Sequence, residues 1–161
     1  MQARIRQASL FTAVAMTSAV VLGGAALAQS SDPLIGSWKL NVAKSKGASF
    51  KSGSTKIEAA GAGVKFTVDL VGADGTVSHW TVTANYDGKD NPVMGNSPYG
   101  GVAAFTRIDT KTTRIVSEQG GKVTVTQTIV VAGDGKTRTT TTKGTDAKGQ
   151  TVDTMAFYEK Q

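Results

Sequence analysis

The clearest pattern in the chain is an alternation of apolar and polar side chains with a period of two residues. Apolar residues occupy every second position from Val64 to Leu70, and polar residues lie between them. The segment from Val77 to Tyr86 repeats the pattern and places Trp80 on its apolar face. Successive side chains of a strand point to opposite faces of a sheet, so this spacing predicts half-buried β-strands.

Turn-forming dipeptides divide most of the chain into short segments rich in Thr and Val. Asp-Gly and Gly-Lys pairs tolerate the positive φ of hairpin turns, and no segment after residue 28 carries a convincing helical repeat. Eight or nine strands at roughly ten-residue spacing are typical of an all-β sandwich or barrel. The expected strands cover residues 34–42, 55–60, 64–70, 77–86, 102–108, 113–118, 123–131, 137–143 and 152–159. We expect residues 43–54 to form a loop or a short helix over a barrel mouth.

The first 28 residues have the features of a secretory signal peptide. Two arginines precede an apolar run from Leu10 to Leu22, and a small-residue motif ends at Ala28. We expect cleavage between Ala28 and Gln29, which leaves a single β-barrel domain of residues 29–161. The alternative is an uncleaved membrane anchor, but the apolar run is short for a spanning helix. The sequence therefore predicts a periplasmic or secreted bacterial protein with no stable membrane insertion after cleavage.

Composition narrows the chemistry that this domain can carry. The leader holds two of the 18 basic residues and none of the 12 acidic ones, so the net charge falls from +6 to +4 on cleavage. The lysines are scattered among turns, which does not favour nucleic-acid binding. The chain has no cysteine and one histidine, which excludes disulfides, thiol nucleophiles, cysteine-ligated metals and multi-histidine metal sites. We expect no cofactor, no metal and no catalytic residues.

Two kinds of polar residue have a simple structural explanation. His79 points to the face opposite Trp80, so it is expected in solvent; with the faces reversed, it would be the one group inside the barrel that titrates near neutral pH. The aspartates cluster in turns, where they stabilise tight turn geometry. They do not provide the ladder of oxygen ligands that a calcium loop needs.

The strand from Thr137 to Thr142 is polar on both faces. One interpretation is a partly polar, wet barrel interior that accepts these hydroxyl groups together with Arg138. A few polar groups among apolar ones are how small-molecule pockets orient their ligands. The other interpretation is an exposed strand in which Thr occurs for its β-propensity alone. The sequence leaves both open.

The two ends of the domain resemble those of a known superfamily. Gly36-Ser37-Trp38 is similar to the start of the first strand in the calycin superfamily, which includes lipocalins and fatty-acid-binding proteins. The resemblance implies an antiparallel up-and-down barrel with Trp38 closing one end. It also implies a basic side chain from the last strand packed across that Trp, and Lys160 is the matching residue.

Longer stretches extend this resemblance over the domain. The segments 36–46, 86–95 and 143–150 resemble a family of small exported bacterial proteins that are described as lipocalin-like and are mostly uncharacterised. The resemblance covers nearly all of residues 35–160. It implies a fold and a compartment, but no established activity or catalytic residue.

We therefore expect an exported barrel that binds a small, partly apolar molecule, for example a lipid, without transforming it. Candidate contacts come from the predicted inward faces and from the irregular segment 87–101. We favour a hairpin turn, a short edge segment at Pro92-Val93-Met94 and a crossover for that segment; the alternative is a lid or mouth with Met94 and Tyr99 as contact residues. The candidate contacts are Phe66, Val68, Leu70, Trp80, Val82, Tyr86, Met94, Tyr99, Phe105 and Thr140.

Three other classes of function remain open at this point. A protein-interaction module, such as an inhibitor of an exported enzyme, would use outward residues and loops to bind an exported protein partner. An enzyme such as an isomerase or hydrolase inside a barrel is disfavoured by the lack of cysteine, the single histidine and the placement of carboxylates in turns. An outer-membrane barrel needs an apolar outer band with aromatic girdles, which the Thr-rich strand and the ten aromatic residues do not supply.

Overall fold

The structure, a computed structural model, describes residues 32–47 and 50–161. The expected signal peptide and its cleavage site lie outside the described residues. Within them the chain is all-β, and no helix is long and apolar enough to cross a membrane.

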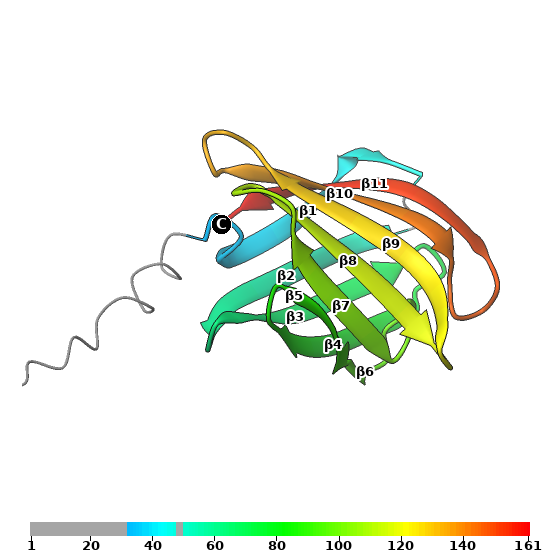
Figure 1. Ribbon diagram of the computed structural model, residues 1–161. Coiled ribbons are helices and arrows are strands. Elements are labelled where there is room, and N and C mark those ends of the chain that lie inside the picture. The colour runs from blue at the N-terminus through cyan, green and yellow to red at the C-terminus, as the bar shows by residue number, and fades with distance from the viewer. Residues whose placement is uncertain (1–31, 48–49) are drawn as a thin grey trace, which may run out of the picture.

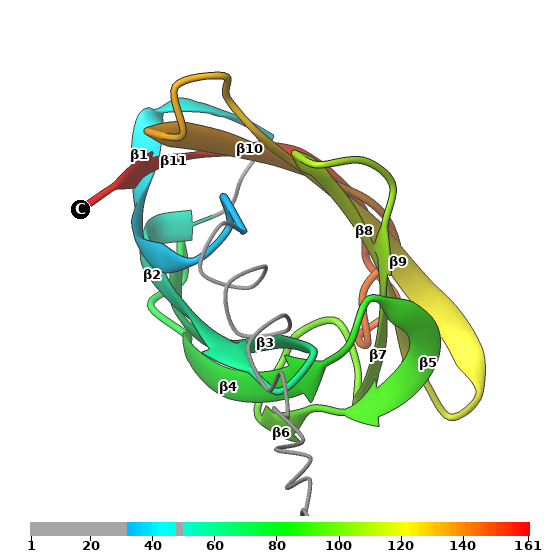
Figure 2. The ribbon, with the colours of Figure 1, turned by 60° about the vertical axis from the view of Figure 1, so that its left-hand side comes forward.

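Eleven strands form one antiparallel sheet that curls into a nearly closed barrel (Figures 1 and 2). Its strands pair in the order β5-β7-β8-β9-β10-β11-β1-β2-β3-β4-β6. Their bounds are β1 Gly36–Lys46, β2 Phe50–Ala60, β3 Gly63–Gly72, β4 Val77–Ala84, β5 Asp87–Pro92, β6 Met94–Gly95, β7 Val102–Arg107, β8 Thr112–Gln119, β9 Lys122–Val131, β10 Thr137–Thr145 and β11 Thr151–Lys160.

All nine expected strands are present, but the expected total of eight or nine is wrong. The two additional strands, β5 and β6, lie in the segment 87–101 that the sequence predicts to be irregular. The expectation of a loop or helix over residues 43–54 is also wrong where the structure describes it. There β1 continues to Lys46 and β2 begins at Phe50. These extensions are mostly exposed, so they lack the buried face that produces an apolar alternation.

The two edges of the sheet meet along β4 on one side and β5 and β7 on the other (Figure 2). No ladder joins β4 to β5 or β7 among the described strands. On its seam side β4 pairs only with the two residues of β6, while its other side pairs with β3. Aromatic side chains cross this seam. Phe66 of β3 packs edge-on against Phe105 of β7, with ring centres 5.2 Å apart. The barrel is therefore closed by side-chain packing as well as by backbone hydrogen bonds.

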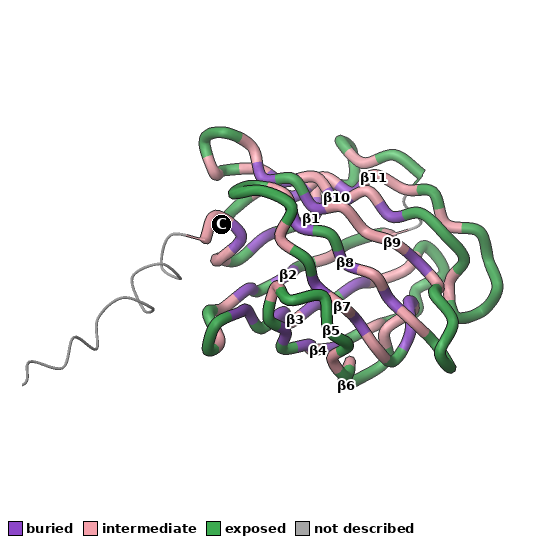
Figure 3. Tube along the Cα trace, in the orientation of Figure 1, coloured by how far each residue is buried: buried purple, intermediate pink, exposed green. Residues whose placement is uncertain are grey.

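Buried and exposed positions alternate along most strands, and the buried ones face the interior (Figure 3). This confirms the apolar faces of 64–70 and 77–86. The polar strand β10 follows the same rule. Arg138, Thr140 and Thr142 are buried, while the residues between them are partly exposed. An interior that accepts polar side chains is thus the interpretation that the structure supports.

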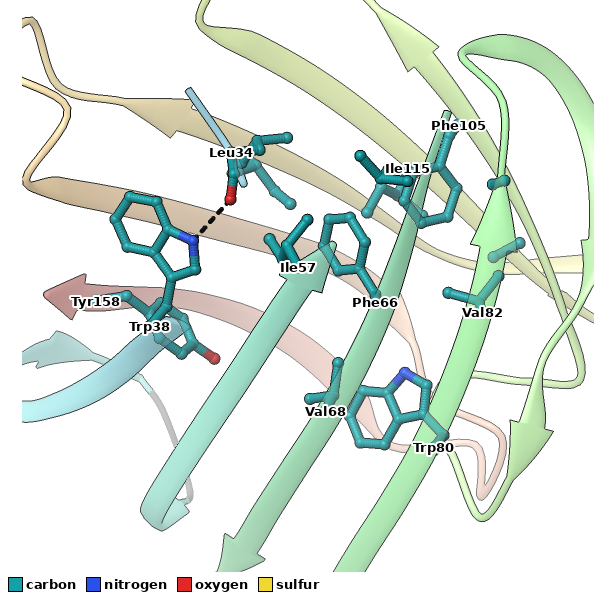
Figure 4. Packing of buried hydrophobic residues seen from close by; sticks show 14 of the residues in the cluster. Leu34, Trp38, Ile57, Phe66, Val68, Trp80, Val82, Phe105, Ile115 and Tyr158 are labelled. Atoms are coloured by element: carbon teal, nitrogen blue, oxygen red, sulfur yellow. Dashed lines mark hydrogen bonds between the residues drawn. The ribbon is translucent and has the colours of Figure 1, made fainter. Parts of the chain in front are cut away.

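The chain before β1 folds across one end of the barrel. Leu34 is fully buried there, and the indole Nε1 of Trp38 donates to its carbonyl oxygen at 2.8 Å (Figure 4). The Asp32 carboxylate accepts a hydrogen bond from the Tyr86 hydroxyl at 2.6 Å and forms an ion pair with Arg107. Because these partners follow β4 and end β7, the same contacts also fasten the seam at this end.

Removing the Leu34 side chain should destabilise the barrel strongly. Leu34→Ala is expected to lower the free energy of unfolding by about 2–5 kcal/mol, because it leaves a cavity in the hydrophobic core. Urea unfolding of residues 29–161, followed by circular dichroism, measures this. Val77→Ala is the control, because Val77 is 64% exposed, and it should change stability by no more than about 0.5 kcal/mol. Equal, small effects of both substitutions would contradict the packing role of Leu34.

Candidate functional site

The barrel interior contains a cavity of about 70 Å³. Inward residues of β2 to β4 and of β7 to β11 surround it, together with Val93 between β5 and β6 and with the segment between β6 and β7. The lining residues are Phe50, Thr55, Phe66, Val68, Leu70, Trp80, Val82, Val93, Ser97, Tyr99, Ala103, Phe105, Ile115, Ser117, Gln127, Ile129, Arg138, Thr140, Thr142, Thr154, Ala156 and Tyr158. A buried water needs roughly 10–15 Å³, so the space holds several waters or a small molecule.

One wall of the cavity is polar, and strand β10 runs along its centre. The antiparallel registers with β9 and β11 set three inward rows, each with a β10 residue in the middle. The rows are Val131–Arg138–Tyr158, Ile129–Thr140–Ala156 and Gln127–Thr142–Thr154. The row with Arg138 lies nearest Trp38, since Tyr158 also pairs with Leu40 on β1.

The opposite wall is apolar. It is built from β3 and β4, which lie across the barrel from β10 (Figure 2), together with β7 and β8, which continue the sheet from β9 to the seam. Its side chains converge in Figure 4, where the ring of Phe66 faces Phe105 and Ile115 while Trp80 and Val82 lie beside them. A molecule in the cavity would therefore contact hydroxyl groups on one side and hydrocarbon on the other.

Arg138 is the charged residue of this lining. It is 3% exposed. Its Cζ lies 4.1 Å from the ring centre of Tyr158 and 5.3 Å from that of Trp38, as in cation–π contacts. Nη1 donates to the Thr140 hydroxyl at 3.2 Å, whereas Nε has no hydrogen-bond partner. No carboxylate of the described residues forms an ion pair with Arg138.

The surroundings do not fully replace the water that this guanidinium has lost. Burial lowers the pKa of Arg138 to about 10, and Tyr158 opposes the shift. Burial also raises the pKa of Tyr158 and of Tyr99. At neutral pH both phenols are therefore neutral and Arg138 is a cation, so the lining carries one positive charge.

The segment between β6 and β7 covers the other end of the cavity. Tyr99 is buried and packs edge-on against Trp80, with ring centres 6.1 Å apart. Its carbonyl oxygen accepts a hydrogen bond from the Thr124 hydroxyl on β9. The Pro98 carbonyl accepts one from the amide of Ala147 in the β10–β11 loop, at 3.0 Å. These contacts hold the segment against three parts of the barrel.

Most of the ligand contacts that the sequence pattern predicts lie together at this cavity. Two lie elsewhere. Met94 is 65% exposed, and Tyr86, which does not line the cavity, donates its hydroxyl to Asp32 at the Trp38 end of the barrel. The eight that line the cavity are Phe66, Val68, Leu70, Trp80, Val82, Tyr99, Phe105 and Thr140.

Arg138 is the main residue missing from the expected contacts. The sequence offered a signal for it, since it has the same parity along β10 as Thr140 and therefore shares its face. His79, in contrast, is exposed as expected, and its Nδ1 lies 2.7 Å from an equally exposed carboxylate oxygen of Asp69. Among the described residues no group of three or more histidine, aspartate or glutamate side chains could hold a metal ion.

Comparisons of the chain with models of known protein families, with curated proteins and with solved structures each find no match.

Replacing the buried charge should cost the fold little. Arg138→Met keeps an unbranched side chain and removes a cation whose desolvation is unfavourable. We expect the free energy of unfolding in urea at pH 7 to stay within about 1 kcal/mol of wild type, or to rise, because replacing a buried charge by an apolar group is often neutral or stabilising. Ile129→Ala, one row away, should cost about 2–5 kcal/mol. A loss of 3 kcal/mol or more in Arg138→Met would mean that its aromatic contacts hold the barrel together.

Proposed function

We propose that this protein is an exported, lipocalin-like barrel that binds a small, partly apolar molecule in its interior without transforming it. The observation that carries the proposal is the cavity with one polar and one apolar wall. Pockets for small molecules combine an apolar surface with a few polar groups that fix orientation. None of the lining residues is a histidine, an aspartate or a glutamate. The lining thus offers no ordinary general base.

The arrangement at the Trp38 end supports the lipocalin-like part of the proposal. Nζ of Lys160, from the last strand, lies 5.1 Å from the Trp38 ring centre, as the resemblance implies. Strands β1 to β4 and β7 to β11 form two antiparallel meanders, which the pairing of the last strand, β11, with the first, β1, joins into one sheet. In an up-and-down barrel of this kind, the inward side chains can enclose a ligand cavity, and the ends of the barrel can be closed by other segments.

The size of the cavity limits the ligand. Pockets for drug-sized molecules usually measure about 300–1,000 Å³, and this one measures about 70 Å³. We therefore propose a ligand of only a few non-hydrogen atoms for the barrel in this conformation. A longer lipid would need the segment between β6 and β7 to move.

Tryptophan fluorescence tests this function with a small, neutral, partly apolar quencher, 2,2,2-trichloroethanol. Trp80 lines the cavity and the other tryptophan, Trp38, does not. Quenching should therefore be saturable in wild type and linear, as for collisions, in Trp80→Phe. The measurement is a titration of emission at constant protein concentration with residues 29–161.

A matched pair of alanine substitutions controls for effects on the fold. Ala103 faces the cavity and Ala104, its neighbour on β7, does not. Ala103→Leu should fill the cavity and abolish the saturable phase, whereas Ala104→Leu should keep it. Linear quenching in folded wild-type protein, or a saturable phase that survives Ala103→Leu, would contradict binding in the cavity.

A further inference from the structure

The buried guanidinium at the Trp38 end of the cavity lacks a partner that proteins normally supply. Buried charges are paired, and buried donors are hydrogen-bonded, because each loses its interactions with water. The other arginine inside the barrel end, Arg107, has its charge paired with Asp32, although its Nη1 also lacks a hydrogen-bond partner. Arg138 has two aromatic faces and one hydroxyl, and its Nε donates to no group. An anion in the cavity would supply what is missing.

A role confined to packing does not explain this arrangement. The Trp38 ring already has a second cation over it, the ammonium group of Lys160, which is exposed to solvent. An apolar side chain at position 138 would fill the interior without the cost of desolvating a charge. The cation is therefore more readily explained by something that it binds.

From this geometry we propose that the cavity is a site for a small monocarboxylate, with its carboxylate on the guanidinium of Arg138 and its apolar part against the wall of β3, β4 and β7. The inference rests on the proposed function and names the chemical class of its ligand. A guanidinium presents a flat, forked set of N–H donors that matches the two oxygens of a carboxylate. The hydroxyl group of Thr140 and the ring of Tyr158 lie beside it, and both residues line the cavity.

The charge and size of the lining favour a single carboxylate over other anions. The described lining residues carry one positive charge, so a dianionic phosphate would leave an unbalanced negative charge in an interior where charge is costly. The volume of about 70 Å³ leaves room for a short apolar part only. Ring and branched aliphatic side chains face that part from Phe66, Val82 and Phe105.

Two quenchers that share a trichloromethyl group distinguish the effect of the ligand's charge on affinity from the effect of its shape. Trichloroacetate is a monocarboxylate, and trichloroethanol is its neutral counterpart. In wild-type protein at pH 7 and constant ionic strength, trichloroacetate should quench Trp80 saturably and bind at least tenfold more tightly than trichloroethanol. In Arg138→Met the preference should vanish, while the affinity for trichloroethanol stays within about threefold of wild type.

Lys160→Met is the matched control, because it removes one positive charge beside the same tryptophan from outside the barrel. It should keep the tenfold preference. Saturable binding of both compounds with equal affinity, or a preference that survives Arg138→Met, would overturn the carboxylate site and leave the proposed function intact. Saturable binding of neither compound would overturn both.

A second variant covers the case in which Arg138→Met does not fold. Arg138→Lys keeps the charge and loses the forked donor geometry, so the preference for trichloroacetate should fall by at least threefold without disappearing. An unchanged preference in Arg138→Lys would overturn the assignment of the forked guanidinium as the carboxylate-binding group.

Discussion

The contact between the two edges of the sheet, along β4 on one side and β5 and β7 on the other, gives this protein an interior. Side chains rather than a continuous ladder make that contact, with Phe66 against Phe105 near the middle and the Asp32–Arg107 ion pair at one end. Closure turns the alternation of each strand into an inside and an outside. Both the core and the cavity depend on this closure, because the polar wall at β10 faces the apolar wall only when the sheet is curled into a barrel.

The interior gives up part of the packing that apolar side chains would supply. A barrel of this size could be filled entirely by apolar side chains, and each buried methylene would add stability. Instead, β10 contributes Arg138 and two threonines, and the space before them is left open. Burial disfavours the charged form of the arginine, as its lowered pKa indicates. Buried polar groups without hydrogen-bond partners are typical of binding sites, where a protein trades some stability for function.

How far the sequence predicts this structure depends on what each residue contacts. Strands with one buried face, such as β3 and β4, follow from alternation alone. Strand β5 does not, because it is exposed on almost every residue and is defined by its pairing with β7. The contact of Arg138 with Trp38 joins segments a hundred positions apart, and it depends on β10 and β1 both flanking β11. Parity along β10 puts Arg138 on the same face as Thr140, but the sequence left open whether that face is interior. The ladders settle this and show Val131 and Tyr158, not a carboxylate, beside Arg138.

The most direct measurement is the ¹H–¹⁵N NMR spectrum of arginine side chains, because residues 29–161 contain three arginines. The Arg138 Nε–H resonance is identified by its loss in Arg138→Met. If Arg138 binds a carboxylate in the cavity, this resonance shifts saturably with trichloroacetate and not with trichloroethanol. The Nε–H resonances of Arg107 and Arg114 then keep their positions. A carboxylate site inside the barrel would be contradicted if the Arg138 resonance did not shift with trichloroacetate. It would also be contradicted if the resonances of all three arginines shifted together.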